Sequence, residues 1–148
     1  MDNSMVAIGA GLAIGLSGLG VATGQSLLAT SSMDILGKNP KLYSTLLIYT
    51  ILGIALVESV VIFGLLVAFQ ILGKEGLDSM HAIGAGLAIG LTGLGAGFGE
   101  GKLVSETIQT VNRNPENKNK ALQFMILFLT LIEVVAIYGL IIALQLLK

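Results

Sequence analysis

The sequence predicts an all-α membrane protein in which four transmembrane helices form two tandem hairpins. Of its 148 residues, 54% are apolar and only 11% are charged, which is too apolar for a soluble domain of this size. The apolar residues form four segments, each longer than the roughly 20 residues that span the hydrocarbon core of a bilayer. These segments are residues 5–32, 43–72, 80–105 and 121–147. The chain is therefore expected to cross the membrane four times.

The second half of the chain repeats the first at an offset of 75 residues. Ala7–Gly20 and Ala82–Gly95 are identical at 13 of 14 positions, and the exception pairs Ser17 with Thr92. The same offset superposes Asn39-Pro40 on Asn114-Pro115, Glu58 on Glu133, Gly64 on Gly139 and Gln70 on Gln145. A repeat of this quality predicts two copies of one structural unit. We place the first hairpin at residues 1–75 and the second at residues 76–148.

Each repeat contains two spans, so both copies have the same orientation in the membrane. Parallel repeats are related by an axis along the membrane normal, and contacts of this kind close into a ring when the rotation permits. The first and third spans alternate glycine and alanine with larger residues, which lets helix backbones approach closely in lipid. We expect these two spans to form an inner ring of helices and the second and fourth spans an outer, lipid-facing ring.

The turn within each hairpin is marked by proline and by basic residues. Pro40 and Pro115 are expected to end the preceding helices, because proline disfavours helix in the residue before it and lacks a backbone donor. Basic residues concentrate in the loops at 34–41 and 111–120, and the positive-inside rule places such loops in the cytoplasm. The two termini and the connector at 73–79 are then expected on the opposite side.

One glutamate interrupts each of the second and fourth apolar segments, near its middle. Glu58 and Glu133 are these residues. A carboxylate at the bilayer centre costs at least about 2.5 kcal/mol, so it marks a functional site by default. The alternative is a protonated glutamate that only ties helices together. Gln25 and Glu100 each lie 33 residues earlier, and folding at the proline turn brings each to the depth of its glutamate.

In this order, the glycine-rich segments, the polar turns Gly-Lys-Asn-Pro (37–40) and Asn-Arg-Asn-Pro-Glu (112–116), and the central glutamates resemble one known family. It is the proteolipid, or c and K, subunits of rotary ATPases and ATP synthases, and the resemblance covers almost the whole chain. The fused four-helix form resembles the K subunit of vacuolar and archaeal-type complexes, whereas the turns and Val-Glu-Ser (57–59) resemble the F-type c subunit. Many fused members retain one glutamate, whereas this chain retains both.

The resemblance also implies a ligand set for the first glutamate. Sodium-binding members combine a glutamine on the inner helix, the central glutamate, the serine after it and the backbone carbonyl two residues before it. Gln25, Glu58, Ser59 and Leu56 match this pattern, and such oxygen ligands suit a hard cation. Because adjacent hairpins share sites in this family, the sequence leaves open whether Ser59 serves the first or the second site.

The second hairpin matches the sodium pattern only in part. Glu100 replaces the glutamine, Glu133 is kept and Val134 offers no hydroxyl. Two carboxylates in a low-dielectric site are not both ionised cheaply, so we expect one of them to hold a proton. Tyr138 matches a family tyrosine that hydrogen-bonds the glutamate, whereas its counterpart Phe63 cannot donate. We therefore favour Na⁺ over H⁺ as the transported ion, more firmly for the first site.

As a whole, the resemblance implies a rotor-ring subunit of a V/A- or F-type ATPase or ATP synthase, without enzymatic activity of its own. Its expected partners are copies of itself, a stator subunit of the a or I type, the central stalk and membrane lipid, without nucleic acid or an organic cofactor. The expected stalk-docking residues are Lys38, Asn39, Pro40, Arg113, Asn114 and Pro115. Two alternatives are a small four-helix multidrug or cation antiporter and a purely structural proteolipid.

Overall fold

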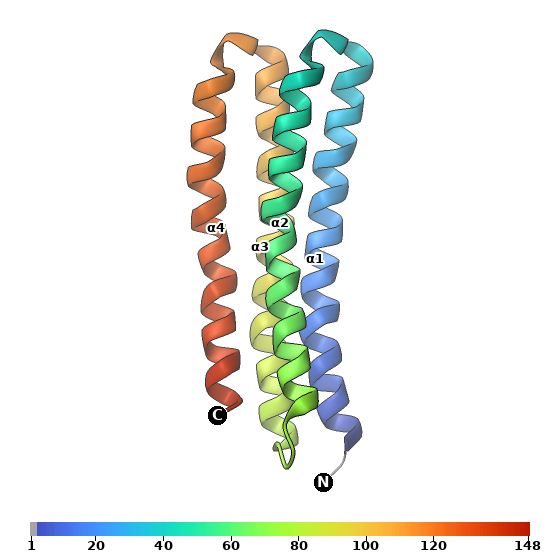
Figure 1. Ribbon diagram of the computed structural model, residues 1–148, viewed down its shortest axis with the longest axis vertical. Helices are drawn as coiled ribbons and strands as arrows, with labels where there is room; N and C mark the ends of the chain where they lie inside the picture. Colours follow the sequence, from blue (N-terminus) through green and yellow to red (C-terminus); the bar gives the residue numbers. More distant parts are fainter. Residues whose placement is uncertain (1–2) are drawn as a thin grey trace.

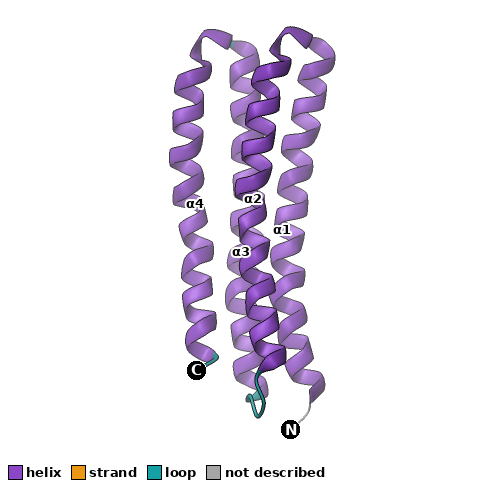
Figure 2. Ribbon diagram, viewed as in Figure 1, coloured by secondary structure: helices purple, strands orange, loops and turns teal. Residues whose placement is uncertain are grey.

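Four long helices run alternately up and down in the computed structural model, which describes residues 3–148 (Figure 1). They are α1 (Asn3–Lys38), α2 (Tyr43–Gly73), α3 (Ser79–Arg113) and α4 (Lys118–Leu146). Short 3₁₀ turns, η1 (Pro40–Leu42) and η2 (Pro115–Asn117), join the helices within each hairpin, and Figure 2 shows how little of the chain is loop. The predicted double hairpin of helices is therefore confirmed. The first two residues, which were assigned to the first hairpin, lie outside the described residues.

The inner helices continue beyond the apolar segments from which they were predicted. The predicted segments end at residues 32 and 105, whereas α1 ends at Lys38 and α3 at Arg113. Hydroxyl groups near these ends turn back onto the helix: Ser32 Oγ donates to the Leu28 carbonyl and Thr107 Oγ1 to the Leu103 carbonyl, each at 2.8 Å. Polar side chains that form hydrogen bonds within the helix in this way do not break it. The helix therefore continues past the end of the apolar segment.

The turns have the same backbone geometry in both hairpins. Asn39 (φ −139°, ψ 76°) and Asn114 (φ −144°, ψ 85°) are extended, and each precedes a proline that begins a 3₁₀ turn. This is the conformation that proline favours in the residue before it. The proline turns predicted from the sequence therefore position both hairpins.

Close packing of α1 against α3 forms the centre of the bundle. A Cβ atom added to Gly24 would overlap the carbonyl oxygen of Gly97, and one added to Gly9 would overlap the backbone of Ala82. Only glycine permits backbones to approach this closely. By contrast, α2 and α4 lie outside this pair, and their contact with each other is much less extensive. The cross-section is therefore narrow at α1 and α3 and wider at α2 and α4.

The same kind of contact joins the two helices within each hairpin. Ser17 on α1 packs against Gly64 on α2, and Thr92 on α3 packs against Gly139 on α4. Both hydroxyls donate to a carbonyl four residues earlier, at 2.7 Å in each case. The 75-residue repeat is thus a repeat of packing as well as of sequence.

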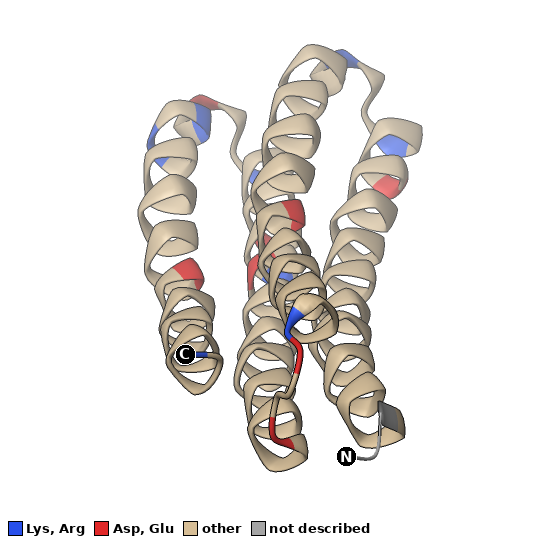
Figure 3. Ribbon diagram, turned by 60° about the horizontal axis from the view of Figure 1, so that its bottom comes forward, with Lys and Arg blue, Asp and Glu red and all other residues tan. Residues whose placement is uncertain are grey.

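The outside of the bundle is apolar along its length. Large exposed side chains include Phe69 on α2, at 64% exposure, and Leu131 on α4, at 60%. All four helices are long and apolar enough to cross a membrane, and many of the charged residues cluster toward the ends of the bundle (Figure 3). An apolar exterior of this extent is unfavourable in water and suits lipid. We describe the chain as an integral membrane protein that crosses the bilayer several times.

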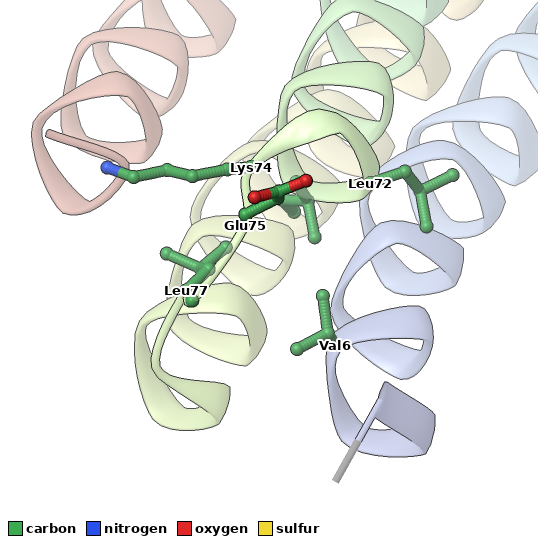
Figure 4. Close-up of a pocket in the computed structure, with 7 residues that line it drawn as sticks. Val6, Leu72, Lys74, Glu75 and Leu77 are labelled. Carbon is green, nitrogen blue, oxygen red and sulfur yellow. The ribbon is translucent and has the colours of Figure 1, made fainter. Parts of the chain in front are cut away.

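The connector between the hairpins is tied to the end of α4. Lys74 Nζ donates to the carbonyl oxygens of Leu147 at 2.5 Å and Lys148 at 2.7 Å, and Figure 4 shows its side chain extending toward α4. Beside it lies a pocket lined by Val6, Ile71, Leu72, Lys74, Glu75, Gly76 and Leu77. The predicted ion-site residues do not line this pocket.

Candidate ion-binding site

The first carboxylate is bonded by an amide of its own hairpin. Gln25 Nε2 on α1 donates to Glu58 Oε2 on α2 at 2.5 Å. The pairing follows from the turn at Pro40, which lies close to the midpoint between the two residues. Glu58 is nevertheless exposed at the edge of the bundle. The structure therefore brings the predicted pair together and leaves one side of it open.

Ser59 contacts the glutamate of the other hairpin. Its Oγ lies 2.7 Å from the Leu56 carbonyl oxygen and 2.8 Å from Glu133 Oε1. Because Ser59 follows Glu58 directly, the two side chains leave α2 in different directions, about 100° apart around the helix. Within one chain, the structure groups Ser59 and Leu56 with Glu133 rather than with Glu58.

Glu100 forms the most buried part of this group. It is only 1% exposed, and its Oε2 is buried without a hydrogen-bond partner among the described residues. Glu133 is close enough to interact with it electrostatically. Like charges repel strongly where the dielectric constant is low, and an unpaired buried carboxylate oxygen is costly. The two carboxylates thus form a site that a cation or a proton would stabilise.

Tyr138 does not join Glu133 within the chain. Its side chain is 63% exposed, and the hydrogen bonds found across residues 3–148 include none between Tyr138 and Glu133. Val134 is half-buried on the same helix. Their counterparts in the first hairpin, Ser59 and Phe63, instead pack between the two hairpins.

The predicted docking residues lie together at one end of the bundle, in the turns η1 and η2 and the helix ends beside them. Lys38 forms an exposed ion pair with Asp34 at 2.7 Å, and Arg113 donates to Thr110 Oγ1 at 3.2 Å. Both bonds are local to their helices. This end therefore presents two similar polar turns side by side.

Several polar bonds that join the hairpins were not predicted from the sequence. The Tyr49 hydroxyl on α2 donates to the carbonyl of Lys118 at the start of α4. Gln109 Nε2 on α3 donates to Ser31 Oγ on α1 at 2.9 Å, and Ser31 Oγ lies 3.4 Å from the Ser105 carbonyl oxygen. Comparison of the two repeats could have drawn attention to the Tyr49 bond, because the counterpart of Tyr49 in the second repeat is a phenylalanine, which has no hydroxyl group.

Two hairpins of apolar helices, each with a carboxylate in its outer helix, define a membrane proteolipid with candidate ion sites. The family model for the ATP synthase C subunit matches the chain twice, at residues 8–71 and 83–146. The chain therefore belongs to this family, and the resemblance predicted from the sequence is confirmed.

Curated relatives match either nearly the whole chain or about half of it. The A-type ATP synthase K subunit of Methanocaldococcus jannaschii is 36% identical over 142 residues, which are 95% of this chain and 60% of that protein. The chloroplastic ATP synthase c subunit of Phaeodactylum tricornutum is 39% identical over 71 residues, 48% of this chain and 87% of that protein. The ATP synthase c subunit of Chloroflexus aurantiacus (strain J-10-fl) is 36% identical over 67 residues, 45% of this chain and 88% of that protein. The chain thus spans about 60% of the length of the K subunit, whereas each of the two c subunits matches about half of this chain.

Proposed function

We propose that the chain is a rotor-ring subunit that carries Na⁺, or H⁺, across the membrane on Glu58 and Glu133. The observation that supports this function best is the bonding of both mid-helix glutamates by side chains of other helices. Gln25 donates to Glu58, and Ser59 donates to Glu133. A carboxylate within an apolar membrane helix costs free energy, so a carboxylate that is retained there is expected to be functional.

In this mechanism the ion neutralises the glutamate while the site moves through lipid. A stator channel loads the ion, and a second channel releases it after the ring has turned. One elementary charge crossing 100 mV yields about 2.3 kcal/mol, so several ions are needed for each ATP. A ring with many glutamates meets this requirement, and each chain supplies two of them.

The ligand chemistry favours Na⁺ over H⁺. Around Glu133 the chain offers the Ser59 hydroxyl, and the Leu56 carbonyl lies beside that hydroxyl. Neutral oxygens are not needed to hold a proton, but a cation that loses its water requires them. At Glu100 and Glu133 we propose that one carboxylate keeps a proton, so that one Na⁺ neutralises the other. Na⁺ then competes with protonation, because both neutralise the same group.

The shape of the bundle supports assembly into a ring. Its narrow side at α1 and α3 and its wider side at α2 and α4 suit an inner and an outer circle of helices. In that ring the turns at Asn39 and Asn114 face the cytoplasm and dock the central stalk, and the termini lie on the opposite side. A stator subunit of the a or I type and lipid contact the outer helices. Such partners suit relatives that are ATP synthase subunits.

Replacement of each glutamate by glutamine tests the function directly. Glu58→Gln and Glu133→Gln keep the size of the side chain but remove its ionisable group, so each is expected to abolish ion-coupled ATP synthesis in the assembled complex. Glu75→Gln, in the connector, is the matched control and is expected to retain activity. Unchanged coupling in both site variants would rule out the mechanism.

The mass of the intact assembly in detergent separates the rotor from the antiporter, whereas the glutamine variants separate the rotor from a structural proteolipid. A large closed assembly supports a rotor, whereas a dimer supports an antiporter. The parallel repeat already disfavours an antiporter, because many alternating-access transporters use inverted repeats. Cross-linking from cysteines placed at Asn39 and Asn114 tests stalk docking in the same complex, and cross-links only to lipid or to the stator would contradict it.

A further inference from the structure

A groove between α1 and α3 contains a neutral polar contact that joins the two hairpins. Ser31 Oγ on α1 accepts a hydrogen bond from Gln109 Nε2 on α3 at 2.9 Å and lies 3.4 Å from the Ser105 carbonyl oxygen. Leu27 and Asp34, four residues before and three residues after Ser31, also line this groove. All of its lining residues belong to α1 and α3, so the outer helices do not cover it.

The 75-residue repeat places charged residues where this contact has neutral ones. Glu106 on α3 is the counterpart of Ser31, and Asp34 on α1 is the counterpart of Gln109. Within the chain, Ser31 and Gln109 face each other, whereas Glu106 and Asp34 belong to the opposite faces of the same helices and are exposed. The faces that could receive another hairpin therefore carry two carboxylates in place of a hydroxyl and an amide.

Lys102 adds a positive charge beside Glu106. It is the counterpart of Leu27 and lies four residues, about one helical turn, before Glu106. Both side chains are exposed, and the ion pairs found across residues 3–148 include neither of them. Lys102 also follows Glu100 by two residues, which places it only about 3 Å along α3 from the depth of that carboxylate. A charge within an apolar span is costly unless it is paired, so a partner outside the chain would stabilise Lys102.

Glycines indicate that a second copy of the chain covers these faces, which we call the free edges. A Cβ atom on Gly20 of α1 or Gly86 of α3 would overlap the backbone of the other inner helix. A Cβ on the counterparts Gly95 and Gly11, at the free edges, has nothing within 4 Å. The free edges thus have the glycines of a close helix contact, and another copy that repeats the internal contact would use them.

We propose that Lys102 of each copy pairs with Glu106 of the same copy and with Asp34 of the next copy, in an ion network that joins the two copies. A second copy that repeats the internal contact brings Asp34 opposite Glu106, as Gln109 is opposite Ser31 within the chain. Two carboxylates would repel each other there, and the ammonium group of Lys102 neutralises the repulsion. This inference rests on the proposed ring.

The charges of this network balance. Glu106 and Asp34 supply two negative charges, and Lys102 supplies one positive charge. Lys38 supplies the other, because its Nζ is bonded to Asp34 at 2.7 Å. A lysine has three donors on a flexible stem, which suits a group shared between two carboxylates. Charged groups would then join neighbouring copies where a neutral hydrogen bond joins the hairpins of one chain, and salt is expected to weaken only the charged contact.

Cysteine cross-linking tests which residues meet between copies. The chain has no cysteine of its own, so Asp34→Cys and Glu106→Cys in one chain provide its only two thiols. A short thiol-reactive cross-linker is expected to join neighbouring copies and to give a ladder of multiples of the chain mass on a denaturing gel. The matched control carries Ser31→Cys and Gln109→Cys, which replace residues in contact inside the chain. It is expected to remain a single chain.

Lys102→Met tests the ion network itself. The methionine retains an unbranched side chain but leaves the two carboxylates without the shared ammonium group, so we expect the assembled ring to dissociate in detergent about tenfold faster, as for one hydrogen bond to a charged group. Adding Glu106→Gln to this variant removes the repulsion and is expected to restore the wild-type rate. Lys120→Met, at an exposed position on α4, is the control and is expected to dissociate at the wild-type rate.

Two results would overturn the network. A variant with Asp34→Cys and Glu106→Cys that stays a single chain after cross-linking would show that these positions do not meet between copies. Equal dissociation rates for Lys102→Met and Lys120→Met would show that Lys102 does not join the copies. The mass of the wild-type assembly is measured in parallel. Either result with an intact wild-type ring refutes only the network, whereas a wild-type sample without a closed ring refutes the proposed function as well.

Discussion

The glutamate of the first hairpin lies at an open edge of the bundle, whereas the glutamate of the second hairpin is partly covered by the first hairpin. Glu58 is exposed and bonded by Gln25 from its own hairpin. Glu133 is half-buried and bonded by Ser59 from the other hairpin, and the neighbouring Glu100 is 1% exposed. Nearly the same pattern of residues thus gives two environments. What surrounds each glutamate depends on the hairpin beside it as much as on its own helix.

The largest effect is expected from leucine at the two matched glycines, Gly20 and Gly95. Gly20→Leu would force a side chain into the backbone of Leu94, so we expect it to destabilise the single chain by about 3 kcal/mol or more. Gly95→Leu meets open space within the chain, so we expect it to leave the chain folded but to block assembly. Thermal unfolding and the mass of the assembly measure the two outcomes.

Normal assembly of the Gly95→Leu variant would break this comparison, because the free edge would then not receive another copy. Gly37→Leu is a suitable control, since a Cβ on Gly37 has nothing within 4 Å and the residue lies near the end of α1. It is expected to change neither quantity.

A smaller effect is expected when the inner-helix partners are exchanged. Glu100→Gln gives the second hairpin the Gln–Glu pair of the first, and the retained proton is no longer required. We expect the Na⁺ concentration that half-protects Glu133 from carbodiimide to move toward that of Glu58. The converse variant, Gln25→Glu, is expected to move the half-protecting Na⁺ concentration of Glu58 toward that of Glu133. If the half-protecting Na⁺ concentration stays the same in both variants, then the residues at positions 25 and 100 do not determine the difference between the sites.

A still smaller effect, on the free energy of unfolding, is expected from the loss of one hydrogen bond between the hairpins. Tyr49→Phe removes the bond to the Lys118 carbonyl, and we expect the free energy of unfolding to fall by about 1 kcal/mol. The counterpart change, Phe124→Tyr, adds a hydroxyl to an exposed residue and is expected to leave the single chain unaffected. Equal effects of the two changes on unfolding in detergent would contradict the assigned bond.

The smallest effect concerns the connector, where Asp78 caps α3. Asp78 Oδ1 accepts from the backbone of Met80 at 2.9 Å and of His81 at 3.2 Å, and lies 3.1 Å from His81 Nδ1. The hydrogen bond with the His81 side chain, followed by the backbone bonds, lowers the pKa of Asp78 below its usual value. A lowered folded-state pKa stabilises the protein above the unfolded value, about 3.9, and this stabilisation is lost as the pH falls through the lowered pKa.

Asp78→Asn retains a capping side chain and removes this pH dependence. The gap between the unfolding midpoints of the wild type and this variant is therefore expected to close in acid. A gap that stays constant as the pH falls from above the unfolded-state value, about 3.9, into strong acid would contradict the assigned role of Asp78.

The architecture could be predicted from the sequence because local signals specify it. Pro40 and Pro115 mark the turns, and the equal spacing of Gln25 to Glu58 and of Glu100 to Glu133 places each pair at one depth. The helices continue beyond the predicted membrane-spanning segments, because hydropathy identifies only the apolar part of each helix.

The sites were less predictable because their ligands come from different hairpins. Leu56 and Ser59 are close in sequence to Glu58, yet Ser59 bonds Glu133. That assignment depends on the rotation between hairpins, which the spacing within one hairpin does not specify. Tyr138 shows the same difficulty, because the family resemblance implies a hydrogen bond to the glutamate without specifying which hairpin provides the tyrosine, and its side chain is exposed in the single chain.

Carbodiimide labelling of wild-type rings, at fixed pH and rising Na⁺ concentration, tests the central claim most directly. If both glutamates carry the transported ion and differ in their surroundings, both will react in the absence of Na⁺. Rising Na⁺ will then slow the labelling of Glu58 strongly and that of Glu133 less, because the proton that we propose is kept at Glu100 and Glu133 competes with Na⁺ there, although Ser59 and Leu56 offer oxygen ligands at that site. Labelling of both glutamates that ignores Na⁺ wherever the unprotected protein reacts would show that the ring carries protons. Failure of either glutamate to react at any pH would contradict its role as an ion carrier.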